Sequence, residues 1–359
     1  MSSIRNLFIF LAVFIFAGTS AFLVRHTGAQ QNESSKTTSP TPTPTPVPDE
    51  EDGVIKVETE GVNVLFTAQD KDRRLLLNLK PEDIRIFENG QPQEITAFSR
   101  QIDLPLSLSI LIDTSISQQR TLPEEKSAAI SFIESVIRPL KDEVSVVSFT
   151  GDTTLEQGMT NNLTRLRHAI DRVEFVPPSG YIGGGVVAGT PPISGRNQAT
   201  QGSTAIWDAI WVTSEEVLGP APEKTRRAII LLTDGANTSG QKNLDDAIQA
   251  AIKSEAVIYS VGIGDQAYGG VNTGVLNKLS ERTGGRAYFP RDESELRQAF
   301  KQIQEEMRSQ YLLAYEPANQ TFDGSYRKIE IQLANPELAK QKVKITHRQG
   351  YFSRTANKK

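Results

Sequence analysis

A short polar segment carries the clearest chemical signal in this chain of 359 residues. Asp113, Ser115 and Ser117 alternate in the sequence DTSIS, so two hydroxyl groups follow one carboxylate at every second position. Residues 106–112 before them are largely apolar, which is typical of a strand that is covered on both faces in a parallel sheet. In open α/β sheets, the carboxyl ends of the strands form the edge at which ligands bind.

Two later segments supply further oxygen ligands. Residues 226–234 read RRAIILLTD, which predicts a second buried strand that ends at Asp234. Thr204 lies between the two strands in the sequence, directly before a helical pattern. Two carboxylates and three hydroxyls, without sulfur or imidazole, suit Mg²⁺ or a similar hard cation such as Mn²⁺ or Ca²⁺. The predicted metal ligands are Asp113, Ser115, Ser117, Thr204 and Asp234.

This ordered set resembles the metal-ion-dependent adhesion site (MIDAS) of the von Willebrand factor type A (VWA) domain, whose pattern is DxSxS, then Thr, then Asp. All three parts occur in family order, and the resemblance covers roughly residues 103–310. Ile116 stands where the family often has glycine. That difference bears on the backbone freedom of the loop and leaves the metal contacts unaffected.

The resemblance also implies what each ligand does. The hydroxyls of Ser115, Ser117 and Thr204 would bind the metal directly, whereas Asp113 and Asp234 would act largely through water molecules. A metal with few directly bound charges stays electrophilic, and one of its waters can be exchanged for a carboxylate of a partner protein. In the alternative without a metal, the aspartates cap loops and the hydroxyls cap helices.

Alternating strand and helix patterns predict the sheet that positions these ligands. The expected fold class is α/β, with a doubly wound, mainly parallel, Rossmann-like sheet that has helices on both faces. Further strands are expected at residues 144–149, 256–263 and 286–289, and helices at residues 123–136, 163–173, 205–218, 244–253, 275–282 and 294–309. A Gly- and Pro-rich loop at residues 177–202 is either a surface insertion or a contact loop at the metal edge.

Strand patterns also flank the VWA-like region. Residues 54–102 contain apolar alternation and the hairpin signal Asn89-Gly90, and residues 311–352 contain three more strand-like segments. Each flank alone has too few apolar faces for an independent core. We therefore expect the two flanks to combine into a small β-sandwich, followed by a tail at residues 353–359.

The first 53 residues are expected to export and tether the folded part. Residues 1–29 contain Arg5, an apolar run and then small residues, which is the pattern of a signal peptide. An uncleaved N-terminal anchor is the alternative, and membrane attachment is expected only through this segment. Residues 30–53 are rich in Pro and Thr, which favours an extended linker. The predicted location is the periplasm, the extracellular space or the outward-facing side of a membrane.

Composition excludes several functional classes. Cysteine is absent, which removes disulfides, zinc–thiolate sites and thiol nucleophiles. The three histidines are scattered, so a histidine-based catalytic or metal cluster is not expected. The formal net charge is −4 with both signs mixed along the chain, so nucleic acid is not an expected partner.

These features predict a non-enzymatic, metal-dependent protein-binding module whose partner offers an Asp or Glu carboxylate. The layout also resembles exported bacterial proteins that carry a VWA-related domain. One alternative is an envelope scaffold in which the metal site is idle. Another is a Mg²⁺-dependent phosphohydrolase, but such enzymes often carry a second aspartate at the position that holds Ser115 here, so no catalytic residue is assigned.

Overall fold

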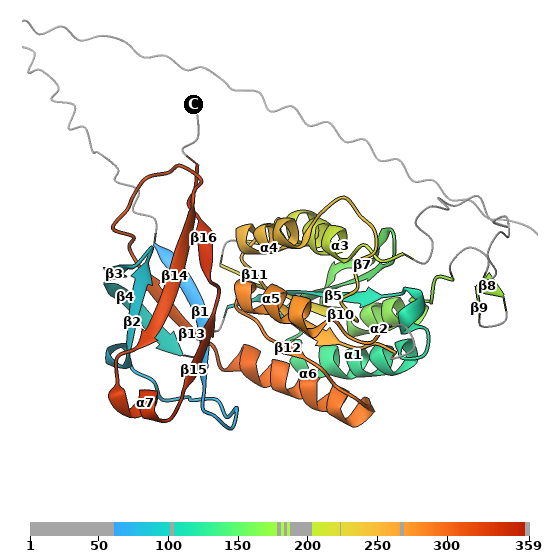
Figure 1. The fold of residues 1–359 in the computed structure, drawn as a ribbon, viewed down its shortest axis with the longest axis horizontal. Helices are drawn as coiled ribbons and strands as arrows, with labels where there is room; N and C mark the ends of the chain where they lie inside the picture. Colours follow the sequence, from blue (N-terminus) through green and yellow to red (C-terminus); the bar gives the residue numbers. More distant parts are fainter. Residues whose placement is uncertain are drawn as a thin grey trace, which may run out of the picture. The chain divides into compact units, whose positions relative to one another are not determined.

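The computed structural model describes the folded part of the chain from Gly61 onward (Figure 1). The described residues are 61–100, 104–177, 181–182, 185–186, 203–222, 224–265 and 269–355. The predicted signal segment, the linker and most of the loop at residues 177–202 lie outside them. Within the described ranges, none of the helices has both the length and the apolar character needed to cross a membrane.

A six-stranded, mainly parallel sheet forms the centre of the α/β domain, as the sequence predicts. In spatial order its strands are β12 (Ala287–Tyr288), β11 (Ala256–Gly262), β10 (Arg226–Thr233), β5 (Leu106–Asp113), β6 (Glu143–Phe149) and β7 (Thr153–Thr160). From β5 the chain first fills the β6 side and later returns to β10, so the strand order reverses between β5 and β10. The antiparallel edge strand β7 was not predicted, because its sequence TTLEQGMT is only partly buried and lacks apolar alternation.

Helices cover both faces of this sheet (Figure 1). On one face lie α1 (Leu122–Val136), α2 (Leu163–Arg172) and α6 (Glu293–Arg308), and on the other lie α3 (Ile206–Val212), α4 (Leu244–Lys253) and α5 (Thr273–Thr283). Successive side chains of a strand point to opposite faces. Ile110 and Ile112 of β5 therefore join the first core, and Leu111 joins the second. A π-helical segment, Thr213–Leu218, continues α3 to the end of the predicted helix.

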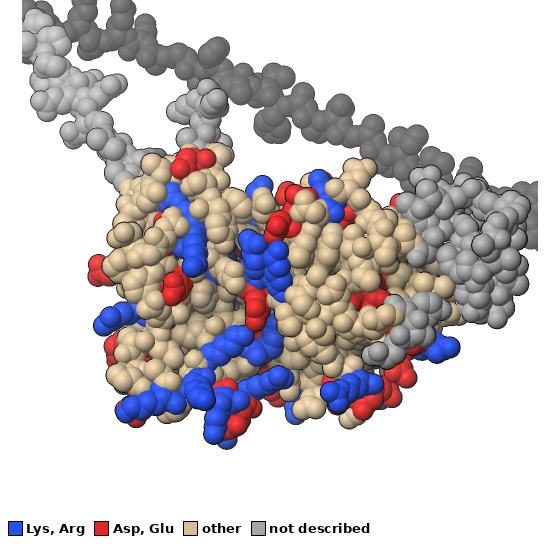
Figure 2. All heavy atoms as spheres, viewed as in Figure 1, with Lys and Arg blue, Asp and Glu red and all other residues tan. Residues whose placement is uncertain are grey.

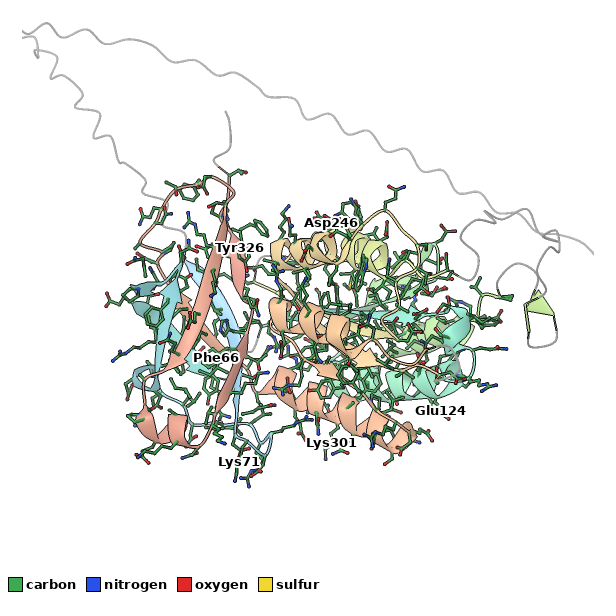
Figure 3. All side chains as sticks on the ribbon, in the orientation of Figure 1. Phe66, Lys71, Glu124, Asp246, Lys301 and Tyr326 are labelled. Atoms are coloured by element: carbon green, nitrogen blue, oxygen red, sulfur yellow. The ribbon has the colours of Figure 1, made fainter. Side chains whose placement is uncertain are left out.

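The predicted β-sandwich is also present, and strands from both flanks form each of its sheets. One sheet contains β15 (Lys344–His347), β1 (Val62–Gln69), β13 (Tyr311–Tyr315) and β4 (Ile95–Arg100), and the other contains β16 (Gly350–Phe352), β14 (Tyr326–Leu333), β2 (Ile84–Glu88) and β3 (Gln91–Gln93). A shared core lies between them, in which Phe66, labelled in Figure 3, stacks on Tyr311 with ring centroids 5.1 Å apart. Both flanks are needed to build this core.

Short elements complete the fold. The expected hairpin joins β2 to β3 at Asn89 and Gly90, whose φ angles of 47° and 82° are the left-handed values that such a turn requires. The remaining elements are the antiparallel pair β8 (Tyr181–Ile182) and β9 (Gly185–Val186), helix α7 (Pro336–Lys340), and 3-10 turns at Pro81–Asp83 and Ile116–Gln118.

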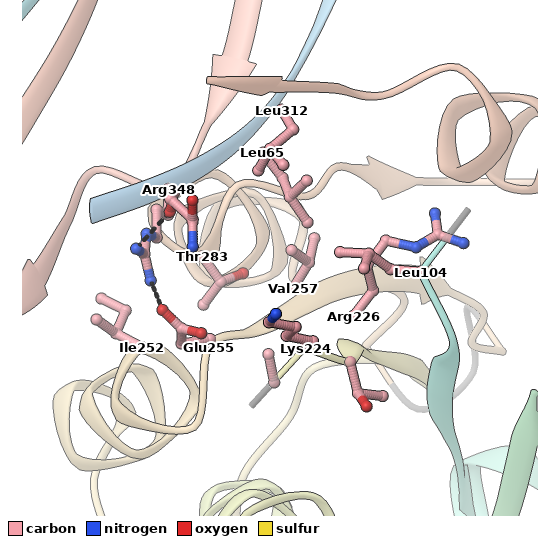
Figure 4. Close-up of a pocket in the computed structure, with 13 residues that line it drawn as sticks. Leu65, Leu104, Lys224, Arg226, Ile252, Glu255, Val257, Thr283, Leu312 and Arg348 are labelled. Atoms are coloured by element: carbon pink, nitrogen blue, oxygen red, sulfur yellow. Dashed lines mark hydrogen bonds and ion pairs between the residues drawn. The ribbon is translucent and has the colours of Figure 1, made fainter. Parts of the chain in front are cut away.

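Polar contacts join the sandwich to the α/β domain. Arg348 donates to Glu255 at 2.9 Å and to the Asn63 carbonyl at 2.7 Å, beside a mostly apolar cavity of about 250 Å³ (Figure 4). Gly284 lies close behind this contact, because a Cβ at that position would come within 2.5 Å of the Arg348 backbone nitrogen. The end of α5 and the β15–β16 connection therefore pack without room for a side chain between them.

A buried ion pair fixes the interior of the sandwich. The side chains of Arg327 and Glu88 are each 3% exposed, and Arg327 Nη1 lies 3.5 Å from Glu88 Oε1. The other carboxylate oxygen accepts hydrogen bonds from Tyr315 at 2.8 Å and from Tyr351 at 2.9 Å. One cation and two hydroxyl donors thus compensate the Glu88 carboxylate for its loss of water.

Removal of one member of this pair should destabilise the protein strongly. We expect Arg327→Met to lower the free energy of unfolding by about 3–5 kcal/mol, because it leaves the Glu88 carboxylate buried without its cation. Urea unfolding followed by circular dichroism measures the change, with Arg85→Met on an exposed position of β2 as the control. A loss below about 1 kcal/mol, as for a surface pair, would contradict this account.

Candidate metal centre

The candidate site lies at the carboxyl edge of the sheet, where β5 and β10 run side by side and the strand order reverses. Leu232 pairs with Ile112, so Thr233 and Asp113 follow at the same level. The Thr233 hydroxyl donates to Asp113 Oδ2 at 2.6 Å, and the Ser115 amide donates to Asp113 Oδ1 at 2.9 Å. Asp113 is fully buried, so these two donors fix the orientation of a desolvated carboxylate.

The turn after β5 brings the two serines of the DTSIS segment together. Ser115 Oγ and Ser117 Oγ lie 3.2 Å apart. Neighbouring oxygens in an octahedron with metal–oxygen bonds of about 2.0–2.1 Å are separated by about 2.9 Å, so both hydroxyls fit adjacent positions around one ion. Gln118 Nε2 donates to Ser117 Oγ at 3.4 Å and to the Ile263 carbonyl at 3.0 Å, which ties the turn to the segment after β11.

Thr204 is held between two loops of the same edge. Its amide donates to Thr238 Oγ1 at 2.8 Å, and its carbonyl accepts from the Thr238 amide at 2.9 Å, in the loop that follows Asp234. The amide of Ala205 donates to the Thr150 carbonyl at 2.7 Å, just after β6. Thr204 is buried and stands directly before α3, so it lies between the loops that follow β6 and β10.

Asp234 is fixed through both its side chain and its backbone. Its Oδ1 accepts from the Ala236 amide at 2.8 Å, and its carbonyl accepts from the Asn272 amide at 2.7 Å. Gly264, just after β11, packs directly against it, since a Cβ there would lie 2.8 Å from the Asp234 Cβ. Any larger residue at position 264 would push Asp234 away from the site.

Two buried carboxylates dominate the electrostatics of this edge. The pKa of Asp113 is raised to about 6; burial is the main cause, the Asp234 carboxylate adds to it, and hydrogen bonds from Ser115 and Thr233 act against it. Among the described residues, the donors to both aspartates are hydroxyls and amides, and neither aspartate pairs with Lys or Arg. A divalent cation would compensate both charges, so the donor set fits the predicted metal.

All five predicted ligands therefore stand at one edge of the sheet, and metal binding by them stays a prediction. Gln118 and Glu125, a fully buried residue of α1, are not among the residues predicted from the sequence. The signal for Glu125 was present, since it is an acid within the buried stripe that Leu122, Ala129 and Phe132 continue. Helical spacing therefore could have indicated an acid in the core next to the DTSIS loop.

An exposed arginine marks the rim of the site. Arg120, in the segment that leads into α1, is 78% exposed at its side chain and pairs with Asp265 at 3.0 Å. Asp265 follows β11, so this ion pair joins the segment before α1 to the segment after β11.

The fold and the site together define a doubly wound α/β domain with an oxygen-rich edge at its switch point. Residues 193–302 match the family model described as the von Willebrand factor type A domain, so the chain carries a domain of this family. The matched range includes Thr204 and Asp234 and begins after the DTSIS segment. A search of curated proteins gave no match.

Several solved structures are similar to this protein. Proximal thread matrix protein 1 from the mussel byssus is 16% identical, with 58% of this chain and 49% of that chain covered and a TM-score of 0.44. BatB from Bacteroides thetaiotaomicron is 18% identical, with a TM-score of 0.43, and the match covers 57% of this chain and 100% of BatB. A von Willebrand factor type A protein from Catenulispora acidiphila is 13% identical, with a TM-score of 0.44, and the match covers 84% of this chain and 76% of that protein. This chain thus spans about half the length of the mussel protein.

The raised pKa of Asp113 should make the metal-free protein sensitive to pH. A carboxyl whose pKa rises from 3.8 to about 6 on folding binds more protons in the folded state, so stability falls as the pH increases through that interval. In chelator at about pH 8, Asp113→Asn should therefore gain up to about 3 kcal/mol over the wild type, and the gain should shrink towards about pH 4. Urea unfolding at both pH values measures this. If Asp113→Asn were less stable than the wild type by the same amount at both pH values, the conclusion that Asp113 is charged and desolvated would be wrong.

Proposed function

We propose that this protein is a non-enzymatic, metal-dependent protein-binding module. Its site would hold Mg²⁺, or Mn²⁺ or Ca²⁺ in its place, and the bound ion would capture an Asp or Glu carboxylate of a partner protein. The observation that carries the proposal is the buried pair Asp113 and Asp234 without a cationic side chain. Two desolvated carboxylates in one place are unfavourable until a cation compensates them. The VWA family match supports the same class of function.

The ligand set favours binding over hydrolysis. Ser115, Ser117 and Thr204 would hold the ion through hydroxyl oxygens, and the bound ion supplies an electrophilic centre for an anionic group. Phosphohydrolase chemistry of the kind considered above would need an acid or base two residues after Asp113. That position holds the hydroxyl of Ser115, which is hydrogen-bonded to Ser117. Mg²⁺-dependent hydrolysis of a generic phosphate ester would contradict the non-enzymatic assignment.

The charge of the protein favours a protein partner over nucleic acid. The formal net charge is −4, and on the face shown in Figure 2 the Lys and Arg side chains lie among Asp and Glu side chains. We further propose that the protein acts outside the cytoplasm, either secreted or held at a membrane by its N-terminal segment. The basis is the signal-like pattern of residues 1–29.

Calorimetric titration with Mg²⁺, Mn²⁺ and Ca²⁺ tests the metal site directly. We expect one binding event in the mature protein, that is, residues 30–359 after removal of the predicted signal segment. Affinity should fall at least about tenfold in Asp113→Ala and Ser115→Ala, since even outer contacts of a metal site have effects of that size. Ser127→Ala, at an exposed position of α1, removes a hydroxyl without touching the site and serves as the control. Heats in Asp113→Ala that match the wild type would refute the assignment.

Partner capture should depend on the metal. With the mature protein as bait, we expect a bound protein to be recovered from an envelope extract in Mg²⁺ and lost in chelator, because the partner carboxylate binds through the ion. Asp113→Ala should lose the same protein even in Mg²⁺. Equal recovery under all three conditions would instead favour a scaffold whose metal site is idle.

A further inference from the structure

A fully buried glutamate beside the candidate site has no hydrogen-bond partner. Glu125 lies in α1 with 0% of its surface exposed, and neither of its carboxylate oxygens forms a hydrogen bond with any described group. Burial of a carboxyl group without a partner is unfavourable, and burial of a charged one is more so. Such a group in a folded protein indicates a missing partner.

The other buried glutamates in the described part of the chain are compensated. Glu88 pairs with Arg327 and accepts two hydrogen bonds from tyrosine hydroxyls. Glu306 pairs with Arg286 at 2.9 Å and also accepts from a tyrosine and a glutamine side chain. Each of these carboxylates has a cation and at least two neutral donors. Glu125 has neither, although it is at least as deeply buried.

The position of Glu125 in the fold places it at the metal edge. The helix that carries it follows the turn with Ser115 and Ser117, so its first turns lie near the carboxyl end of β5. Buried residues of this helix include Leu122, Glu125 and Ala129, which recur at the spacing of a face that packs on the sheet. Glu125 therefore belongs to the stripe that packs on the sheet, at the end of the helix nearest the site.

A polar chain links this helix end to the serines. The Glu125 amide donates to the Thr121 carbonyl at 3.0 Å, and the Thr121 hydroxyl donates to Gln118 Oε1 at 3.0 Å. Gln118 in turn donates to Ser117 Oγ at 3.4 Å. The Thr121 hydroxyl, which also acts on the pKa of Glu125, has its single proton engaged by Gln118 in this arrangement. The turn is thus organised in a way that leaves the Glu125 carboxylate without a donor.

Charge interactions connect Glu125 to both aspartates. Burial is the main cause that raises the pKa of Glu125 to about 8; the negative charges of Asp113 and Asp234 add to the rise, and Thr121 acts against it. Both aspartates thus act on Glu125 in a buried region of the described fold, and none of the three carboxyl groups pairs with Lys or Arg there. A divalent cation is the partner that all three lack.

We propose that Glu125 is a further carboxylate of the metal site, a positioning residue that holds a water molecule of the bound cation. This inference rests on the proposed metal function. Among the described residues, no group of three or more acidic or histidine side chains is arranged to ligate one ion, so Glu125 acts from outside the direct ligands. Outer partners of this kind change metal affinity by about 10–100-fold.

Calorimetric titration of the mature protein with Mg²⁺ tests the proposal against a matched control. Glu124, labelled in Figure 3, is the adjacent residue on the same helix and is exposed, so Glu124→Gln makes the same substitution without removing a buried acid. We expect Glu125→Gln to weaken Mg²⁺ binding by about tenfold or more, and Glu124→Gln to change it by less than about twofold. Equal affinities in the two variants would overturn the role of Glu125.

Thermal unfolding separates this role from a merely structural one. In chelator, Glu125→Gln should melt at or above the wild-type temperature, because an amide replaces an unpaired buried acid. In saturating Mg²⁺ it should gain less in melting temperature than the wild type gains. A variant that melts lower in chelator and gains as much from Mg²⁺ would show a structural role only.

Two further outcomes keep the inference distinct from the metal function. If Glu125→Gln does not fold, Glu125→Asp replaces it: the shorter side chain keeps the charge but withdraws the carboxylate, so Mg²⁺ affinity should still fall, and an unchanged affinity overturns the proposal. If the wild type binds no divalent cation, the metal function itself fails, and the role of Glu125 fails with it. If the wild type binds and Glu125→Gln binds equally well, only the role of Glu125 fails.

Discussion

Carboxyl groups gathered in a buried region are the constraint that organises this protein. Asp113 and Asp234 end two neighbouring strands and are almost completely buried, and Glu125 faces the same region from α1. A fold tolerates uncompensated charge of this kind only where the surrounding structure holds it in place, and such arrangements are typical of binding sites. The remainder of the α/β domain can be understood as the structure that keeps these groups together.

The residues around the site hold the Asp113 and Asp234 carboxylates in their buried positions. Thr233 and the Ser115 amide hold Asp113, while Gly264 leaves only enough room for Asp234. Thr204 is tied by its own backbone to the loop after β10. Since each contact comes from a different loop, the geometry of the site depends on the register of the whole sheet rather than on any one segment. A metal ion would complete an arrangement that the protein already holds in shape.

The sandwich shows how the same chain handles buried charge without a ligand. There, Glu88 receives a cation and two hydroxyl donors from within the fold, so the network is complete and stabilises the core. At the carboxyl edge of the α/β sheet, the donors around Asp113 are neutral, and no Lys or Arg among the described residues pairs with it. The two places therefore differ physically: the sandwich network is complete within the fold, whereas Asp113 has no cationic partner among the described residues.

Much of the fold and most of the candidate ligands could be predicted from the sequence, because the signals are local. The apolar strand of residues 106–112 followed by DTSIS, the helical periodicity of α4, and Asn89-Gly90 each reflect conformational preferences of neighbouring residues. The edge strand β7 gave no such signal, since its residues are only partly buried and its position is set by pairing with β6.

The sequence by itself determined which oxygen-bearing side chains follow the end of each strand, and it therefore predicted a hard-cation site there. Tertiary structure alone decided that Thr204 lies between two loops and which strands of the two flanks pair in each sheet of the sandwich. It also decided that Glu125 has no partner, whereas Glu88 has three. The reason is physical: composition and spacing show that an acid is present, but burial, distance and the supply of donors depend on residues far away in the chain.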